Sequence, residues 1–163
     1  MILQASRRIR FVEWLRGILG APLVAHQAAA LVWRRGRKGP EILLITSRDT
    51  GRWVLPKGWP EAGECLADAA RREAAEEAGI RGRASGQCLG RYYFDKHLDN
   101  GVVRRCQVDV YPVLVKRQVK NWPEKSARYQ VWVPLRTAAK MVAEPDLAEI
   151  IRSFGGQAVK DAA

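Results

Sequence analysis

The stretch from Trp53 to Ile80 constrains the fold most strongly, because three glutamates recur in it at helical spacing. Glu73, Glu76 and Glu77 stand at i, i+3 and i+4, positions that share one face of an α-helix. Like charges at this spacing repel one another and would weaken an isolated helix. A hard cation such as Mg²⁺ prefers carboxylate oxygens as ligands and would neutralise them. The spacing therefore predicts a helix with a metal-binding face.

The charge of the chain is unevenly distributed around the same stretch. The whole chain has a net charge of +11, whereas residues 58–80 contain six acids and two bases and carry −4, which leaves +15 on the remainder. An acidic site within a basic protein suits a metal centre that receives a highly anionic substrate. The excess of positive charge is equally compatible with binding to nucleic acid or to an anionic membrane surface.

Length and composition predict one globular domain in a reducing compartment. A chain of 163 residues is long enough for one domain with a core and too short for two ordinary domains. Cys65, Cys88 and Cys106 lie far apart and form no C-x-x-C pair. This spacing argues against a zinc site and a disulfide framework, and we therefore expect a cytoplasmic location. No apolar run reaches the length of a transmembrane helix.

Hydrophobic periodicity and turn residues predict strands that alternate with helices. The expected strands are residues 25–34, 41–47, 53–55, 87–97, 102–116 and 129–133, and the expected helices are 64–78, 135–142 and 145–154. Gly79 should end the first helix in a left-handed conformation, and Gly155 and Gly156 should end the last. The domain division that we expect is an N-terminal arm or helix at 1–22, the main domain at 23–156 and a tail at 157–163.

Residues 58–80 match the pattern G-x(5)-E-x(7)-R-E-U-x-E-E-x-G-U, in which U is a bulky aliphatic residue, and the chain therefore resembles the Nudix hydrolase family. Its one departure is Ala74, which is small where a larger aliphatic residue is usual. The resemblance implies an α/β fold, the α/β/α sandwich around a mixed β-sheet. It also implies Mg²⁺-dependent hydrolysis of P–O–P bonds, with Mn²⁺ as a substitute. Such cleavage needs neutralised phosphate charge and a positioned water.

The same resemblance implies a role for each residue of the motif. Glu76 would hold a further metal ion or act as the base that deprotonates water, and Arg72 would orient the glutamates by ion pairing. Some members of the family use a loop glutamate outside the motif as the base, which makes Glu124 the alternative. The residues that would bind the metal are Gly58, Glu64, Glu73 and Glu77.

A Ser-Arg pair before a turn, followed by a Trp-x-x-Pro-x-Gly segment, resembles the diphosphoinositol polyphosphate phosphohydrolase branch. That branch also takes diadenosine polyphosphates. The chain departs from it at Trp59-Pro60, where glycines are common in the branch. Lys140 is a further basic candidate. The residues that would bind phosphates are Ser47, Arg48, Lys57 and Arg105.

Three other functions compete with this interpretation. The first is an ADP-ribose or nucleotide-sugar pyrophosphatase. The second is removal of pyrophosphate from RNA 5′ ends, which the positive charge outside the motif would suit. The third is a binding or regulatory protein of the same fold without turnover, although such proteins usually lose glutamates that this chain keeps. The expected partner is an anionic polyphosphate small molecule, with nucleic acid less favoured, and the chain would act as a monomer or homodimer.

Overall fold

The structure is a computed structural model that describes residues 24–98 and 100–160, with side chains described through residue 155. The strands are β1 (Ala25–Gly36), β2 (Gly39–Thr46), β3 (Trp53–Val54), β4 (Lys57–Gly58), β5 (Ile80–Ala84), β6 (Gly90–His97), β7 (Val103–Gln118) and β8 (Gln130–Pro134). The helices are α2 (Leu66–Ala78), α3 (Leu135–Met141) and α4 (Pro145–Lys160), with a short 3₁₀ turn, η1 (Lys125–Ala127). The arm predicted for residues 1–22 lies outside the described residues.

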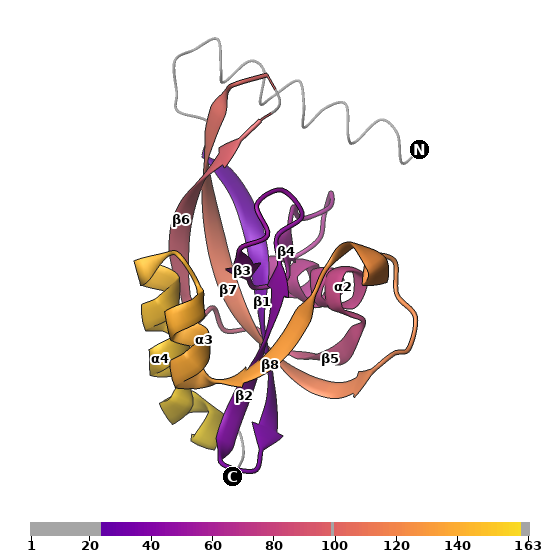
Figure 1. Ribbon diagram of the computed structural model, residues 1–163, viewed down its shortest axis with the longest axis vertical. Coiled ribbons are helices and arrows are strands. Elements are labelled where there is room, and N and C mark those ends of the chain that lie inside the picture. The colour runs from indigo at the N-terminus through magenta and orange to yellow at the C-terminus, as the bar shows by residue number, and fades with distance from the viewer. Residues whose placement is uncertain (1–23, 99, 161–163) are drawn as a thin grey trace.

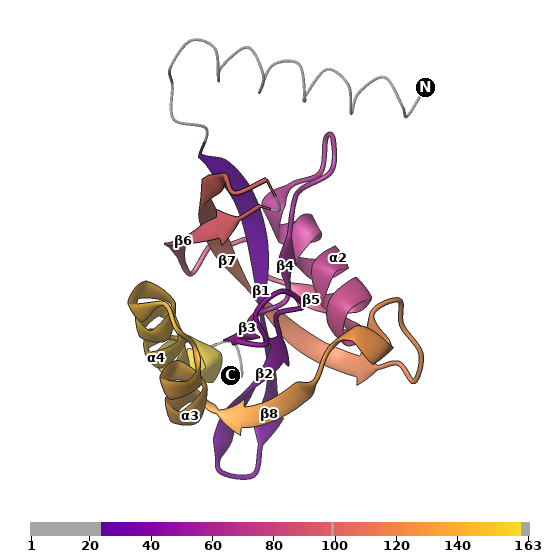
Figure 2. The same ribbon diagram turned by 45° about the horizontal axis from the view of Figure 1, so that its top comes forward.

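The strands form one mixed sheet with helices on both faces (Figures 1 and 2). Its main order is β3-β2-β1-β7-β5, while β4 pairs with β1, β6 with β7 and β8 with β2. The long strands β1 and β7 run parallel, and the other pairs are antiparallel. Helix α2 covers one face, and α3 and α4 cover the other. The predicted α/β/α sandwich around a mixed sheet is thus confirmed.

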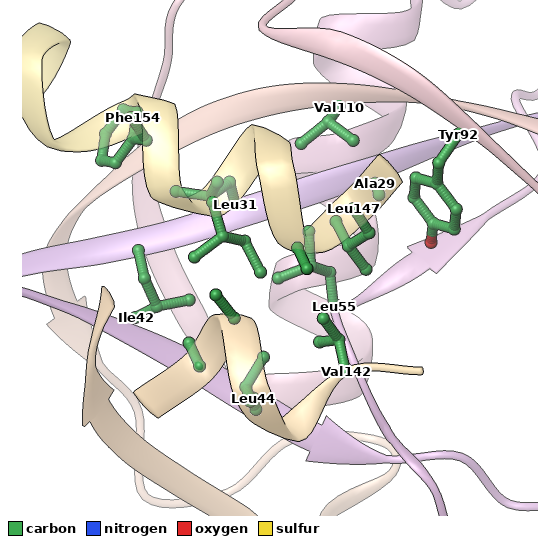
Figure 3. Close-up of a cluster of buried hydrophobic side chains, with 14 of the residues drawn as sticks. Ala29, Leu31, Ile42, Leu44, Leu55, Tyr92, Val110, Val142, Leu147 and Phe154 are labelled. Carbon is green, nitrogen blue, oxygen red and sulfur yellow. The ribbon is translucent and has the colours of Figure 1, made fainter. Parts of the chain in front are cut away.

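Strand β1 is buried on both faces and divides the core into two clusters. Because successive side chains of a strand point to opposite faces, Leu31 and Trp33 join the cluster under α3 and α4, whereas Ala30 and Val32 join the cluster under α2. Figure 3 shows Leu31 beside side chains that α4 contributes, with Phe154 at one end of the cluster. This continuous burial fixes the position of β1. Because β4 pairs with β1, the position of β4 and of the loop that follows it is fixed as well.

Helix α2 lies close to the sheet because its inner face is made of alanines. Ala70, Ala74 and Ala78 are fully buried, and the small side chain of Ala74 permits this close packing. The helix begins at Leu66, after an N-cap at Cys65, and so starts later than the residue 64 that the sequence predicted. Gly79 ends the helix with φ 69°, which confirms the predicted left-handed cap.

Three other predictions about local structure differ from what is observed. Lys57 and Gly58, expected in a loop, form β4 and pair with β1. The β5 segment Ile80–Ala84 was not predicted, because its alternating arginines and central glycine lack a strand pattern, and pairing with β7 determines its conformation. The prediction that Gly155 and Gly156 end the last helix was wrong, since α4 continues to Lys160. A helical glycine costs about 1 kcal/mol relative to alanine, which packing of the helix offsets.

Gly79 is needed both for its backbone conformation and for its lack of a side chain. An added Cβ would meet the indole ring of Trp122, whereas Gly51, also at positive φ, has open space around it. We expect Gly79→Ala to lower the free energy of unfolding by about 2 kcal/mol and Gly51→Ala by about 1 kcal/mol, because both suffer backbone strain and only the first displaces a ring. Urea unfolding measures both. Equal losses would contradict the packing role of Trp122.

Candidate functional site

A cleft of about 250 Å³ lies at the junction of β1, β4, β6, α2 and the loops that follow β2, β4 and β7. Eight of its twelve lining residues carry a charge, and acids and bases are present in equal number. The lining residues are Gln27, Ser47, Arg48, Asp49, Lys57, Gly58, Trp59, Glu73, Glu77, Lys96, Glu124 and Arg128. A concave site with this mixture of charges suits an anionic ligand together with a cation.

The guanidinium group of Arg72 connects the glutamates of α2 to the loop that precedes the helix. Its Nη2 donates to the Trp59 carbonyl oxygen at 2.8 Å, and its Nε donates to Glu64 Oε1 at 3.0 Å. Its Nη1 donates to Glu73 Oε1 at 2.7 Å and to Glu76 Oε2 at 3.3 Å. The hydrogen bond from Arg72 holds the pKa of Glu64 below its ordinary value. One arginine thus holds three carboxylates in a fixed arrangement beside the cleft.

The backbone of Gly58 and the carboxylate of Glu73 are in direct contact. A Cβ added at Gly58 would overlap both carboxylate oxygens of Glu73, so the close approach of β4 to α2 requires glycine at this position. Glu73 is 8% exposed, and burial raises the pKa of its carboxyl group despite the bond from Arg72. A buried carboxylate with a raised pKa is held in its charged form when a cation binds beside it.

Glu77 is the most strongly perturbed acid of the cleft. Its Oε2 accepts a hydrogen bond from the Lys57 backbone N–H at 3.0 Å, and its Oε1 accepts a short hydrogen bond from Arg128 Nη2. Burial raises the pKa of Glu77 to about 7, against the opposing effect of the Arg128 charge. Burial also lowers the pKa of the Lys57 ammonium group, which lines the same cleft. The cleft therefore places poorly solvated charges of both signs within reach of a ligand.

The loop between β7 and β8 completes the cleft. Arg128 donates from Nε to Glu124 Oε2 at 2.6 Å and from Nη1 to the Thr46 carbonyl oxygen at 2.9 Å, and its side chain is only 7% exposed. Glu124 in turn lies 3.5 Å from Arg48 Nη1, and its backbone N–H donates to the Glu76 carbonyl oxygen at 3.2 Å. The structure thereby brings Glu124, predicted as an alternative base, into the cleft.

The glutamates fit a hard divalent cation by the chemistry of their donors. Glu64, Glu73, Glu76 and Glu77 contribute only carboxylate oxygens, the ligand type that Mg²⁺ prefers. No three acidic, histidine or cysteine side chains of the described residues converge in a ready ligand set. Arg72 and the arginine of the β7–β8 loop contact these glutamates, so a cation would bind with some rearrangement of the arginine contacts. Each carboxylate oxygen has further lone pairs that can take part in binding the cation.

The structure brings together some of the predicted phosphate-binding residues and separates others. Ser47, Arg48 and Lys57 all line the cleft. Arg105 is not among the lining residues, and its guanidinium lies 3.2 Å from Asp95 Oδ1 on the β6–β7 hairpin. Lys140 is exposed on α3 and does not line the cleft either. The phosphate-binding set suggested by the structure is therefore smaller than the set predicted from the sequence.

Sequence reasoning missed two cations that the fold brings to the cleft. Arg128 precedes β8 in a polar loop, and Lys96 lies near the end of β6. Neither belongs to a motif, and no local pattern distinguishes Arg128 from a solvated surface base. The alternation along β6, in which Tyr92 and Phe94 point inward, could have indicated that Lys96 shares their face.

A sequence model of the NUDIX domain family matches residues 25–154 of the chain. The chain is 32% identical over 115 residues to "Nudix hydrolase 21, chloroplastic" of Arabidopsis thaliana, a match that covers 70% of this chain and 56% of that protein. It is 31% identical over 118 residues to "Diphosphoinositol polyphosphate phosphohydrolase 3-beta" of Homo sapiens, covering 71% of this chain and 68% of that protein. The chain thus spans little more than half the length of the plant relative.

Solved structures show the same fold. The "C. elegans Ap4A Hydrolase Binary Complex" superimposes with a TM-score of 0.63 at 22% identity, covering 84% of this chain and 99% of that chain. The NUDIX domain of Shewanella oneidensis NrtR, complexed with ADP ribose, gives a TM-score of 0.59 at 19% identity, covering 80% and 87% respectively. Within residues 24–98 and 100–160, no helix has the length and apolar character needed to span a membrane.

Proposed function

This chain belongs to the NUDIX domain family, and on that premise we propose that it is a Mg²⁺-dependent hydrolase of P–O–P bonds in a polyphosphate-rich small molecule. The relatives described above carry the name of hydrolases. One observation carries the proposal: buried Glu73 and Glu77 share a single cleft with basic residues from four other segments. Acids that can hold a cation and bases that can hold phosphates therefore face the same space.

In the proposed mechanism, one group of residues would hold the metal ion and Arg72 positions that group. Glu73 and Glu77, with the Gly58 carbonyl and Glu64, would hold Mg²⁺, with Mn²⁺ as a substitute. When bound, the metal neutralises phosphate charge and lowers the pKa of water. Arg72 keeps the carboxylates in position through the hydrogen bonds described above. Fixed positioning and charge neutralisation are the main requirements of phosphoryl transfer.

Glu76 and Glu124 are the two candidates for the base that accepts a proton from water. Glu124 lines the cleft, which supports it. Glu76 lies beside the cleft and is paired with Arg72 at 3.3 Å. The two are connected, because the Glu124 backbone N–H donates to the Glu76 carbonyl oxygen. Since a base must lie within reach of the proton that it accepts, parallel substitution of both acids is the appropriate test.

A substrate with several phosphates suits the charge of the cleft. The bases Arg48, Lys57, Lys96 and Arg128 line it, and guanidinium and ammonium groups bind phosphate through charge-assisted hydrogen bonds. Trp59 also lines the cleft and is 39% exposed. An exposed indole is a stacking surface for a nucleobase, which supports diadenosine polyphosphates first and diphosphoinositol polyphosphates second. ADP-ribose, nucleotide sugars and RNA 5′ ends remain the alternatives.

Arg48 provides the test of this substrate class. We expect Arg48→Ala to raise the KM for diadenosine tetraphosphate about tenfold and the KM for ADP-ribose much less, because one charge-assisted hydrogen bond to phosphate contributes about 1.5–3 kcal/mol. Steady-state kinetics with both substrates measure the difference. The shorter phosphate chain of ADP-ribose needs fewer basic contacts at the rim of the cleft.

Arg52→Ala is the matched control for this measurement. Arg52 belongs to the same turn and donates to Thr50 Oγ1 at 3.2 Å, but it does not line the cleft. Its replacement should leave the KM of both substrates nearly unchanged. An equal effect of Arg48→Ala on diadenosine tetraphosphate and ADP-ribose would count against a long polyphosphate substrate and favour ADP-ribose.

A further inference from the structure

A second concavity, of about 350 Å³, lies between α2, β5 and β7, and its charged residues are all basic. Arg71, Arg81, Lys116 and Arg117 contribute to its lining, and the other lining residues are neutral. We call it the α2–β5–β7 pocket. Basic residues on a surface are commonly solvated, so the arrangement of these four decides whether they form a site.

The pairing of β5 with β7 places two arginines directly opposite each other. Arg81 is the register partner of Arg117, while Gly82 is the partner of Val115. Lys116 is therefore the extra residue of a β-bulge, which turns side chains away from the regular alternation. Like charges at directly opposite positions destabilise a strand pair. The sheet thus concentrates cations in one concavity, although their mutual repulsion opposes the pairing of β5 with β7.

The pocket and the catalytic cleft lie on opposite flanks of the same helix. Arg71 and Ala75 of α2 line the pocket, whereas Glu73 and Glu77 line the cleft. Residues two apart on a helix differ by about 200° in direction, so the two sets face away from each other. The contact of Arg71 with Asp68, at 3.6 Å, is exposed and contributes little. The basic pocket is therefore separate from the site that would hold the metal.

The hairpin between β1 and β2 is also basic but is a weaker candidate. The concavity there includes the carboxylate of Glu41. Arg34 pairs with that carboxylate at 2.8 Å and lies over the Trp132 ring at 4.2 Å. Part of the positive charge of the hairpin is thus already neutralised within the protein. In the described part of the chain, no acid lines the α2–β5–β7 pocket that could do the same.

We propose that the α2–β5–β7 pocket binds a compact chain of phosphates at a second anion site, distinct from the catalytic cleft. Arginine side chains form forked hydrogen bonds to phosphate oxygens, and lysine adds a point charge. Among the residues that the structure describes, no aromatic side chain lines the pocket, so they offer no stacking surface for a nucleobase there. The chemistry therefore fits the phosphates of a short inorganic polyphosphate better than the bases of a nucleic acid.

Binding of inorganic tripolyphosphate to the full chain, measured by calorimetry in EDTA and low salt, tests this proposal independently of hydrolysis. We expect the double variant Arg81→Gln/Arg117→Gln to weaken binding at one class of sites by about tenfold or more, since each charge-assisted hydrogen bond is worth that factor. The matched variant Arg37→Gln/Lys38→Gln removes the same charge from the β1–β2 hairpin and should retain that binding. Equal effects of the two variants would overturn the proposal.

Thermal unfolding without ligand gives a second readout of the same variants. Removal of the opposed arginines should raise the melting temperature at low ionic strength, because a like-charge pair is lost. A lower melting temperature of the Arg81→Gln/Arg117→Gln variant would contradict the role assigned to this repulsion.

A single-stranded oligonucleotide of equal charge is the second ligand in the calorimetric binding experiment. Pocket-dependent binding of the oligonucleotide that is tighter than that of tripolyphosphate would overturn the assignment to a compact phosphate chain.

Discussion

Replacement of Glu77 by glutamine is expected to lower kcat by roughly three orders of magnitude, because loss of a carboxylate that we propose binds Mg²⁺ would remove about 4 kcal/mol of transition-state stabilisation. Glu77 is buried, lines the cleft and contacts both Arg128 and the β4 backbone. Glutamine has nearly the same shape and retains one oxygen that can accept the hydrogen bond from Lys57, while its amide NH2 replaces the oxygen that accepts from Arg128. The variant therefore removes the negative charge and leaves the packing of α2 almost unchanged. Single-turnover kinetics measure the loss.

The stability of the metal-free Glu77→Gln variant serves as its control. Burial raises the pKa of Glu77 to about 7 in the folded protein. A raised carboxyl pKa favours the folded state below the ordinary pKa of about 4.3. This contribution is lost as the pH rises through about 7. At pH 8 the relief from burying a charge should therefore offset the lost hydrogen bond from Arg128, and the variant should remain folded. Exposed Glu61, replaced in the same way, should keep wild-type kcat, and a folded Glu77→Gln enzyme with wild-type kcat would contradict the assigned role.

The same assay separates the two candidate bases. Glu76→Gln and Glu124→Gln each remove a carboxylate near the cleft, and loss of a general base lowers the rate by about 10²- to 10⁴-fold. The larger fall in kcat identifies the base. The smaller effect on the other variant reflects its contact with Arg72 or Arg128.

Arg72→Met is expected to lower kcat about 100-fold, because a misplacement of catalytic groups by about 1 Å has an effect of that size. The guanidinium bonds to Glu64, Glu73, Glu76 and the Trp59 carbonyl, so its loss leaves three carboxylates without their shared cation. The free energy of unfolding should also fall by about 1.5–3 kcal/mol, the range measured for hydrogen bonds to charged groups. Kinetics with a polyphosphate substrate and urea unfolding measure the two effects.

The adjacent residue on the same helix provides the control for Arg72→Met. Arg71 is exposed, and its ion pair with Asp68 is also exposed. Arg71→Met should therefore leave kcat unchanged and shift the free energy of unfolding by less than about 0.5 kcal/mol. Equal losses in the two variants would show that Arg72 acts through general surface charge and not through the positions of the glutamates.

The parts of the fold that the sequence predicted are those with local signals. Apolar strands β1, β2 and β7, the alanine-rich helix α2 and its Gly79 cap were all predicted within a few residues. The clustering of glutamates on one helix was also predictable, because helical spacing places them on one face. The contact of Arg72 with Glu76, four residues further along the helix, follows directly from that geometry.

The features that the sequence did not predict depend on contacts between distant segments. Arg128 reaches Glu77 across 51 positions in the chain, and no local pattern marks it. Strand β5 forms because β7 offers an edge, although its own sequence has no strand pattern. Arg105 was predicted from its place on a basic hairpin, but Asp95 on the partner strand pairs with it. The last two depend on the register of the sheet, and the first depends on the course of the loop between β7 and β8.

The most direct test of the proposed function is an assay of phosphate or nucleotide release from diadenosine tetraphosphate, diphosphoinositol polyphosphate, ADP-ribose and 5′-triphosphorylated RNA. Wild-type protein and Glu77→Gln are compared in Mg²⁺ and in EDTA. We expect release by the wild type in Mg²⁺ alone, with the highest kcat/KM for a polyphosphate, and almost none by the variant. A folded wild-type protein that hydrolyses none of these substrates, or hydrolyses them equally well in EDTA, would contradict the proposed Mg²⁺-dependent hydrolase.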